Sequence, residues 1–510
     1  MRILRSVSFL LFVVTHALAG SSPLDIADRA QLFVDRVLVQ RSDRVFFTQH
    51  SGTPHPENPL VRADQPWEGW RLEMHGSVIY DQEKKIFKMW YLGDAGDSKE
   101  YFEQRYFICY ATSRDGIRWE KPLVGTLPSS NGKPHNVVLT GTTLGNVIKD
   151  PRDPDPNRRY KMIGSHARTY VSPDGLNWQP YSQGSVWPDV ADATTGFWDQ
   201  RRQLFVMFPK VGRRARTFWL GQKRRLFYTI TSRNFVEWTE PVLSWTTDSR
   251  DDAGSLARIE RVRPVLDQPD DPELMRTEYY GVGVYTAESC TIGFPWIFTI
   301  NNNARWGNHE GPQEVQLAVS RDLFHWERPF RTPVISLIDV GQWDCCYQAT
   351  GNRALRVGDE IRLYYDGATY THGTPVLYRA EFEDGRPTGR DRFTASIGLA
   401  TWPLDRFVSV DAGPDEGTLT TVPVSFSGSR LVINAQTRPR GKIVIQILDA
   451  AGRPVQGLEP SNPFTGDSLR GEISFPEGPD LSQWTDQPVV LRFRLKNASL
   501  YSFAFRGPGD

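Results

Sequence analysis

The stretch VSPDGLNW at residues 171–178 joins the end of an apolar run to a turn and a tryptophan. Its spacing, a serine with Asp or Asn two positions later and Trp six positions later, occurs four times. The copies are SRDGIRW, SPDGLNW, SRNFVEW and SRDLFHW, which begin at Ser113, Ser172, Ser232 and Ser320. Ser and Asx side chains bind nearby backbone N–H groups in turns, so each copy is predicted to separate two strands. The chain is therefore built from repeats.

A β-hairpin is predicted in each repeat. The hairpins are GSVIYDQEKKIFKMWYLG from Gly76, GNVIKDPRDPDPNRRYKMIG from Gly145, TGFWDQRRQLFVMF from Thr195 and RALRVGDEIRLYYDG from Arg353. A further strand pair from Glu278, EYYGVGVYTAESCTIGFPWIF, precedes SRDLFHW, so the last hairpin belongs to a fifth unit. Five units of four strands predict a five-bladed β-propeller. Residues 32–40 and 55–61 are expected to supply the strand that closes the ring.

The composition changes after Asp411, where alternating strands continue without the serine-to-tryptophan spacing. This pattern predicts a separate β-sandwich. The expected organisation is all-β, with a signal peptide at 1–19, a five-bladed propeller at 20–415 and a small C-terminal sandwich at 416–510.

The first residues, MRILRSVSFLLFVVTHALAG, combine two arginines, a short apolar run and a small-residue ALA site. These are the features of a secretory signal peptide, and the run is too short for a comfortable membrane span. The protein is therefore expected to be exported to the periplasm or the extracellular space.

The formal charge is balanced, with 60 Lys and Arg against 60 Asp and Glu. The net charge therefore indicates neither nucleic acid nor an anionic membrane as a binding partner. Aromatic residues make up 12% of the chain and include 16 Trp, which suits an all-β fold and the stacking of sugar rings. A carbohydrate is therefore the expected partner. The sequence indicates no particular oligomeric state.

Four cysteines are present, Cys109, Cys290, Cys345 and Cys346, without metal-binding spacing. Adjacent cysteines such as Cys345 and Cys346 disfavour a mutual disulfide in regular structure, so all four are expected to be buried small hydrophobes, with a disulfide as the minor alternative. No cofactor is expected, and nothing in the sequence supports a Ca²⁺ ion in the channel.

The inner strands of propeller blades begin at one mouth of the channel, so residues at their starts should converge. The candidate catalytic carboxylates there are Glu73, Asp192, Glu278 and Asp344. Carboxylates that meet in a tryptophan-lined pocket suit glycosidic-bond chemistry, in which one protonates the leaving oxygen and another attacks the anomeric carbon or activates water.

Further residues near the same mouth are candidates for substrate binding. They are Trp67, Glu68, Trp70, His75, Asp189, Glu288, Arg305, Trp343 and His372. The arginine-rich segment KVGRRARTFWLGQKRR at 210–225 either grips an acidic or sulfated sugar or forms a solvated loop, and the solvated loop is favoured.

The stretches LFVDRVLVQ, HPENPLV, PWEG, YATSRDGIRWEKP, LAVSRDLFHWERP and VGDEIRLYYDG resemble exported bacterial proteins of the five-bladed glycosyl hydrolase superfamily. Those proteins are similar to the N-terminal domains of glycoside hydrolase families 32 and 43. The resemblance covers nearly the whole mature chain and implies the propeller and the appended sandwich. The Trp-Met-Asn-Asp-Pro-Asn motif of family 32 is absent, and His75 stands where family 43 carries an Asp in blade one.

Three functions follow as hypotheses. The first is a secreted glycoside hydrolase that cleaves plant or algal poly- or oligosaccharide. The second is a noncatalytic glycan-binding propeller. The third is a glycoside phosphorylase, which needs a basic phosphate subsite for which Arg305 or Arg71 would serve.

Overall fold

The computed structural model describes residues 22–69, 71–95, 99–212, 216–304, 309–373 and 394–507. The expected signal peptide at 1–19 and the candidate residues Trp70 and Arg305 lie outside these ranges. Across the described residues, no helix is both long enough and apolar enough to cross a membrane.

The first three blades are separate antiparallel sheets of four strands each. Blade one contains β6 (Arg71–Asp81), β7 (Ile86–Asp94), β8 (Tyr106–Ser113) and β9 (Val137–Thr140). Blade two contains β10 (Asn146–Lys149), β11 (Tyr160–Ile163), β12 (Arg168–Ser172) and β13 (Gln179–Ser185). Blade three contains β14 (Val190–Asp199), β15 (Leu204–Val211), β18 (Phe227–Ser232) and β19 (Val242–Trp245), and a hairpin of β16 (Thr217–Trp219) and β17 (Gln222–Arg224) projects from it.

Blades four and five share one nine-stranded sheet because β22 pairs with β24. Blade four contains β20 (Arg276–Thr286), β21 (Thr291–Ile300), β22 (Gln313–Val315) and β23 (Ala318–Ser320). Blade five contains β24 (Tyr347–Thr350), β25 (Leu355–Val357), β26 (Glu360–Ala368), β27 (Ala395–Pro403) and, from the start of the chain, β5 (Thr53–Pro54).

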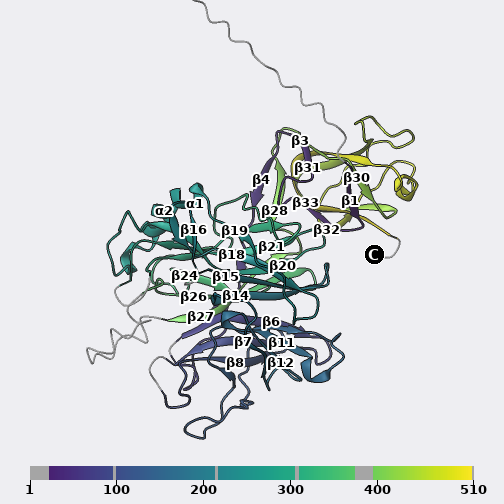
Figure 1. The fold of residues 1–510 in the computed structure, drawn as a ribbon. Coiled ribbons are helices and arrows are strands. Elements are labelled where there is room, and N and C mark those ends of the chain that lie inside the picture. The colour runs from purple at the N-terminus through teal and green to yellow at the C-terminus, as the bar shows by residue number, and fades with distance from the viewer. Residues whose placement is uncertain are drawn as a thin grey trace, which may run out of the picture.

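The innermost strands contact one another in a closed cycle, β6 with β10, β10 with β14, β14 with β20, β20 with β24, and β24 with β6. The body of the molecule in Figure 1 is therefore a five-bladed propeller. The ring is closed from the N-terminal side, since β5 pairs with β27 and Val61 bridges to Ile397. The expectation that residues 55–61 help to close the ring is confirmed at Val61.

The repeated turn has one conformation in all four copies. In the second copy, the Ser172 hydroxyl accepts a bond from the Gly175 N–H at 2.9 Å, and the Asp174 carboxylate accepts two from the next backbone N–H groups. The fourth residue of each copy has a left-handed backbone, with φ of 77° at Gly116, 84° at Gly175, 66° at Phe235 and 77° at Leu323.

In three of the copies, this left-handed residue presents its carbonyl to the preceding blade. The Trp90 indole of blade one donates to the Gly175 carbonyl at 2.8 Å, and the Tyr364 hydroxyl of blade five donates to Gly116 at 2.7 Å. The Thr229 hydroxyl of blade three donates to Leu323 at 2.9 Å. The spacing visible in the sequence is therefore the joint between neighbouring blades.

The remaining strands form a module of one bent ten-stranded sheet around a separate apolar core, seen apart from the propeller body in Figure 1. Its strands are β28 (Val408–Ala412), β29 (Gly417–Thr421), β30 (Val424–Phe426), β31 (Arg430–Asp449), β32 (Asp467–Glu472) and β33 (Val489–Arg506), together with β1 (Leu24–Ala27), β2 (Gln31–Leu32), β3 (Val39–Asp43) and β4 (Phe46–Gln49). The two halves of the long β31 and β33 pair with each other across register shifts, so the sheet folds back over its core in the manner of a sandwich.

The expectation that residues 32–40 help to close the propeller ring was wrong. β2 pairs with β33 and β3 pairs with β29, both in the C-terminal module. The physical reason is that Phe33 and Leu38 are fully buried in the apolar core of that module, which fixes this segment there.

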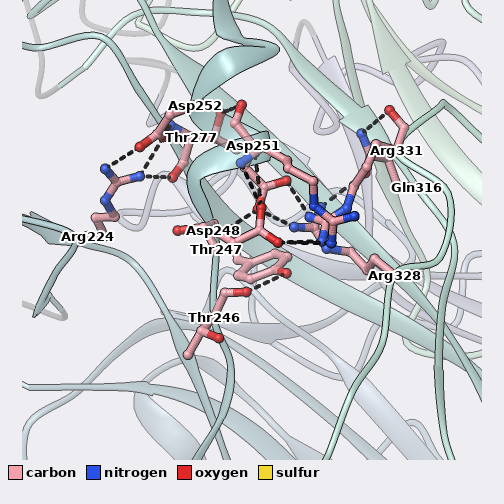
Figure 2. Close-up of polar contacts among 12 residues, drawn as sticks. Arg224, Thr246, Thr247, Asp248, Asp251, Asp252, Thr277, Gln316, Arg328 and Arg331 are labelled. Carbon is pink, nitrogen blue, oxygen red and sulfur yellow. Dashed lines mark hydrogen bonds and ion pairs between the residues drawn. The ribbon is translucent and has the colours of Figure 1, made fainter. Parts of the chain in front are cut away.

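Short helices occupy the connections. They are α1 (Ser249–Ala253), α2 (Ser255–Arg261) and the 3-10 helices η1 (Pro156–Arg158), η2 (Ser165–Ala167), η4 (Arg263–Val265) and η6 (Leu481–Trp484). Figure 2 shows how α1 is fixed, with the Asp251 carboxylate held by Arg328 and Arg331 from the end of blade four.

The adjacent cysteines Cys345 and Cys346 form a disulfide, which was the minor alternative to the favoured expectation of four buried thiols. The pair lies directly before β24 and packs in a small core with Val262. Cys109 and Cys290 are buried free thiols, as expected.

This pairing predicts the outcome of thiol counting. Alkylation of the unfolded, unreduced protein should modify two cysteines, Cys109 and Cys290, and alkylation after reduction should modify all four. Intact-mass measurement counts the added groups. Four modified thiols before reduction would contradict the Cys345–Cys346 bond.

Candidate functional site

A cavity of about 200 Å³ lies at the mouth of the channel where the inner strands begin. Every blade contributes to its lining. The residues are Arg71, Glu73, His75, Leu92 and Tyr106 from blade one, Thr143 and Leu144 from the start of blade two, Asp192 and Ala193 from blade three, Tyr280 from blade four, and Tyr347, Tyr370 and His372 from blade five. We call this the mouth cavity. It contains two of the four candidate carboxylates, Glu73 and Asp192.

The Glu73 carboxylate contacts two side chains of its own strand, those of Arg71 and His75. One carboxylate oxygen forms an ion pair with Arg71, and the other lies 3.1 Å from Nδ1 of His75. Arg71 is in turn paired with the buried Asp94 at 2.8 Å. This chain of contacts fixes the carboxylate at the cavity wall.

His75 is oriented by stacking as well as by Glu73. Its ring lies parallel to the Trp296 indole, with centroids 5.2 Å apart and planes inclined by 7°. Burial lowers the pKa of His75, so the neutral ring predominates at neutral pH. Because an ionised carboxylate only accepts, Nδ1 carries the proton that faces Glu73 and Nε2 is left as an acceptor. Nε2 is buried and has no hydrogen-bond partner among the described residues.

Asp192 is the exposed carboxylate of the cavity. Its side chain is 53% exposed, and Oδ1 accepts bonds from Lys210 Nζ at 3.0 Å and from the Ala193 N–H at 2.8 Å. The Lys210 ammonium holds the pKa of Asp192 well below its ordinary range. Asp192 is therefore ionised throughout the physiological pH range.

His372 and Tyr280 also line the cavity and contact each other. His372 donates from Nδ1 to the His309 carbonyl at 2.6 Å, and its Nε2 lies 3.2 Å from the Tyr280 hydroxyl. Burial lowers the pKa of His372 to about 3, which keeps the ring neutral. This pair is a polar, uncharged surface suited to sugar hydroxyls.

The structure does not bring Glu278 and Asp344 to the mouth cavity. Glu278 is fully buried between Arg225 at 2.5 Å and Arg276 at 2.7 Å. Burial alone would raise the pKa of Glu278, but the two arginines outweigh it and hold that pKa at about 2. Asp344 is buried against the Tyr365 hydroxyl at 2.7 Å, and burial raises its pKa to about 6.

The remaining candidates are distributed between structural and peripheral positions. The Trp67 indole is buried and donates to Asn136 at 2.6 Å, and Glu68 is buried between Tyr91 and Lys121. Trp343 packs against Gly367 and Gly398 of blade five. Glu288 pairs with Arg506 at the junction with the C-terminal module. Of these residues, none lines the mouth cavity.

Three inner strands lose regular alternation near the mouth, and this decides which side chains enter the cavity. The register shifts between Glu73 and Ser77 in β6, between Val190 and Thr194 in β14, and between Tyr279 and Gly281 in β20. Such bulges redirect side chains. In β20, the shift leaves Glu278 buried and places Tyr280 at the cavity.

A second recess adjoins the mouth cavity and shares Asp192 and Tyr280 with it. Sequence reasoning favoured a solvated loop for residues 210–225, and the structure contradicts this for Lys210, Arg224 and Arg225, whose side chains are buried. They are buried because each is paired with a carboxylate, Asp192, Asp252 and Glu278 respectively.

In the described part of the chain, no three or more His, Cys, Asp or Glu side chains gather in a way that could hold a metal ion.

No protein-family model matches the chain, and no curated protein matches it. Among solved structures it is similar to a β-1,2-mannobiose phosphorylase from Listeria innocua, with 12% identity and a TM-score of 0.42 over 69% of this chain and 97% of that one. It is similar to a thermostable family-43 glycoside hydrolase, with 14% identity and a TM-score of 0.40 over 66% of this chain and 91% of that one. It is also similar to a family-32 β-fructofuranosidase from Bombyx mori, with 13% identity and a TM-score of 0.36 over 91% of this chain and 95% of that one. We therefore infer function from the residues of the chain itself.

Proposed function

We propose that this chain is an exported enzyme that cleaves glycosidic bonds of an oligo- or polysaccharide in the mouth cavity. The observation that carries the proposal is the meeting of Glu73 and Asp192, from different blades, in one cavity lined by tyrosines and neutral histidines. Two carboxylates that face a shared space, with aromatic and polar walls, suit the oxocarbenium-like transition state of glycoside cleavage.

Asp192 takes the role of the ionised group. Lys210 keeps its carboxylate charged, and its exposure at the cavity gives access to an anomeric carbon or to a water beside it. Attack by Asp192 itself would make the enzyme retaining, and activation of water would make it inverting.

Glu73 and His75, which line the same cavity, act together as the proton-transfer unit. The leaving oxygen needs a proton. We assign its donation to Nε2 of His75, which has no hydrogen-bond partner among the described residues. Glu73 stabilises the imidazolium through its 3.1 Å contact with Nδ1. Trp296 prevents rotation of the ring away from the substrate.

This assignment predicts an acidic pH optimum. The donating form of His75 is its protonated form, and burial places its pKa below the ordinary value of 6.5. Turnover should therefore fall as pH rises through that lowered pKa, while Asp192 stays ionised on the acidic side. The pH profile of kcat checks this, and His75→Gln should remove the alkaline limb. A kcat that increases from pH 5 to pH 8 would exclude His75 as the acid.

The proposal is tested by release of reducing ends from a panel of plant and algal glycans, with Asp192→Asn and Glu73→Gln measured beside the wild type. Product that is lost in both variants supports the assignment. Saturable glycan binding without product in the wild type would instead favour a noncatalytic glycan-binding propeller. Product that forms only when phosphate is present would favour a phosphorylase.

A further inference from the structure

The recess beside the mouth cavity has a volume of about 520 Å³ and carries a concentration of positive charge. Its described lining includes Asp189, Asp192, Lys210, Arg216, Arg225 and Tyr280. We call it the basic recess. Because it shares Asp192 and Tyr280 with the mouth cavity, one ligand can occupy both.

The charges of the lining do not cancel. Three cationic side chains, Lys210, Arg216 and Arg225, stand against two carboxylates, Asp189 and Asp192. Glu278 lies behind the lining, and the equally buried Arg276 balances its charge at 2.7 Å. Among the described residues, the lining therefore has one positive charge in excess, which a single anionic group would neutralise.

The two deepest cations are rigidly placed. Lys210 is bound to Asp192 at 3.0 Å and lies 4.7 Å from the centre of the Tyr280 ring. Arg225 is bound to Glu278 at 2.5 Å and lies 5.5 Å from the same ring. Both side chains are almost completely buried, so their ordering is complete before a ligand arrives. Such preorganised donors bind anions with little further entropy loss.

The loops that frame the recess adopt unusual backbone conformations. His166, Ala167 and Asp189 have left-handed φ values of 59°, 51° and 55°. Nδ1 of His166 lies 3.0 Å from the Val190 carbonyl, which ties the blade-two loop to the start of β14. Non-glycine residues in this region are costly and gather where a precise surface is needed.

We propose that the basic recess binds the anionic substituent of an acidic sugar, a carboxylate or a sulfate ester, when the adjoining part of the glycan lies in the mouth cavity. The proposal rests on the proposed function for the placement of the glycan. Arg216 is the outermost cation and is half-buried beside His309, with which it shares a 3.1 Å contact. It is the residue whose replacement disturbs the Asp192–Lys210 and Arg225–Glu278 pairs least.

The test is the affinity of the full chain for matched acidic and neutral glycans, measured by calorimetry. One arm compares an oligogalacturonate with its methyl ester, and a second compares a sulfated galactan oligosaccharide with its desulfated form. The acidic member of at least one pair should bind about tenfold or more tightly, as expected for a charge-assisted contact. Added salt should reduce that preference.

Arg216→Met should lower the preference by about tenfold, and the control Arg233→Met, an exposed arginine in the outer turn of the same blade, should retain it. Equal affinity for both members of each pair would overturn the proposal that the basic recess binds an anionic substituent. Cleavage of neutral glycans in the same experiment would leave the proposed function intact. Inorganic phosphate that competes for the recess and is required for turnover would also overturn it, in favour of a phosphate subsite. Binding of the acidic glycan without cleavage of any glycan would overturn the proposed function and support the recess.

Discussion

Replacement of Asp192 by asparagine is expected to lower kcat by roughly 10²- to 10⁴-fold, the usual effect of losing a positioned acid or base. Asparagine keeps the shape of the side chain and removes the charge that Lys210 stabilises at 3.0 Å. The amide can neither attack an anomeric carbon nor take a proton from water. Glycan binding should change little, because the side chain remains a hydrogen-bonding group at the same place in the mouth cavity.

The control is Asp64→Asn. Asp64 is also exposed, with 61% of its side chain accessible, and is also paired with a lysine, Lys121, at 2.7 Å. It lies outside the mouth cavity. Initial rates and calorimetric affinities of the two variants separate loss of chemistry from loss of binding. A variant at Asp192 that keeps the kcat of the wild type would remove this carboxylate from the mechanism.

The propeller was predictable because its signal is local. Each Ser-x-Asx turn is closed by bonds within a few residues, as between Ser172 and Gly175, and the same residues bind the next blade. The destination of the N-terminal strands was not predictable in this way. Gln31 pairs with Phe503 across almost the whole chain, and an apolar run such as that around Phe33 fits either core.

The candidate site was predictable only in part, because the convergence of the inner strands can be read from the sequence and the bulges within them cannot. The expectation that inner strands converge led to Glu73, His75, Asp192 and His372, all of which line the mouth cavity. It did not exclude Glu278, because simple alternation along a strand cannot show a bulge such as that at Tyr279 and Gly281. Lys210 was missed because its burial depends on Asp192, a partner 18 positions away in the sequence.

Figure 2 shows a network of ion pairs and hydrogen bonds around Asp251, outside the mouth cavity. The side chain is almost fully buried, and its oxygens accept from Arg328, from Arg331 at 2.7 Å and from the Asp248 N–H at 2.9 Å. The Arg258 guanidinium binds the Asp251 carbonyl at 2.5 Å. One carboxylate therefore holds α1 against blade four and neutralises buried arginine charge.

Asp251→Asn is expected to lower the free energy of unfolding of the propeller by about 3–5 kcal/mol, the range for breaking one side of a buried ion pair. The asparagine leaves the Arg328 guanidinium, only 3% of whose side chain is exposed, without its anion. The thermal midpoint should fall by roughly 5–10 °C. Tryptophan fluorescence can follow the transition, because Trp245 and Trp326 border the same surface pocket as Arg328 and Arg331.

The matched control is Glu260→Gln in α2, which removes an ion pair with Arg263. The Glu260 side chain is 58% exposed. Solvent already stabilises both charges there, so the cost should stay within about 1 kcal/mol. Arg328→Met in the Asp251→Asn background provides the sharper test, because it removes the stranded charge and should recover part of the lost stability. If Asp251→Asn unfolds at the midpoint of the wild type, buried charge at Asp251 is not what fastens α1 to blade four.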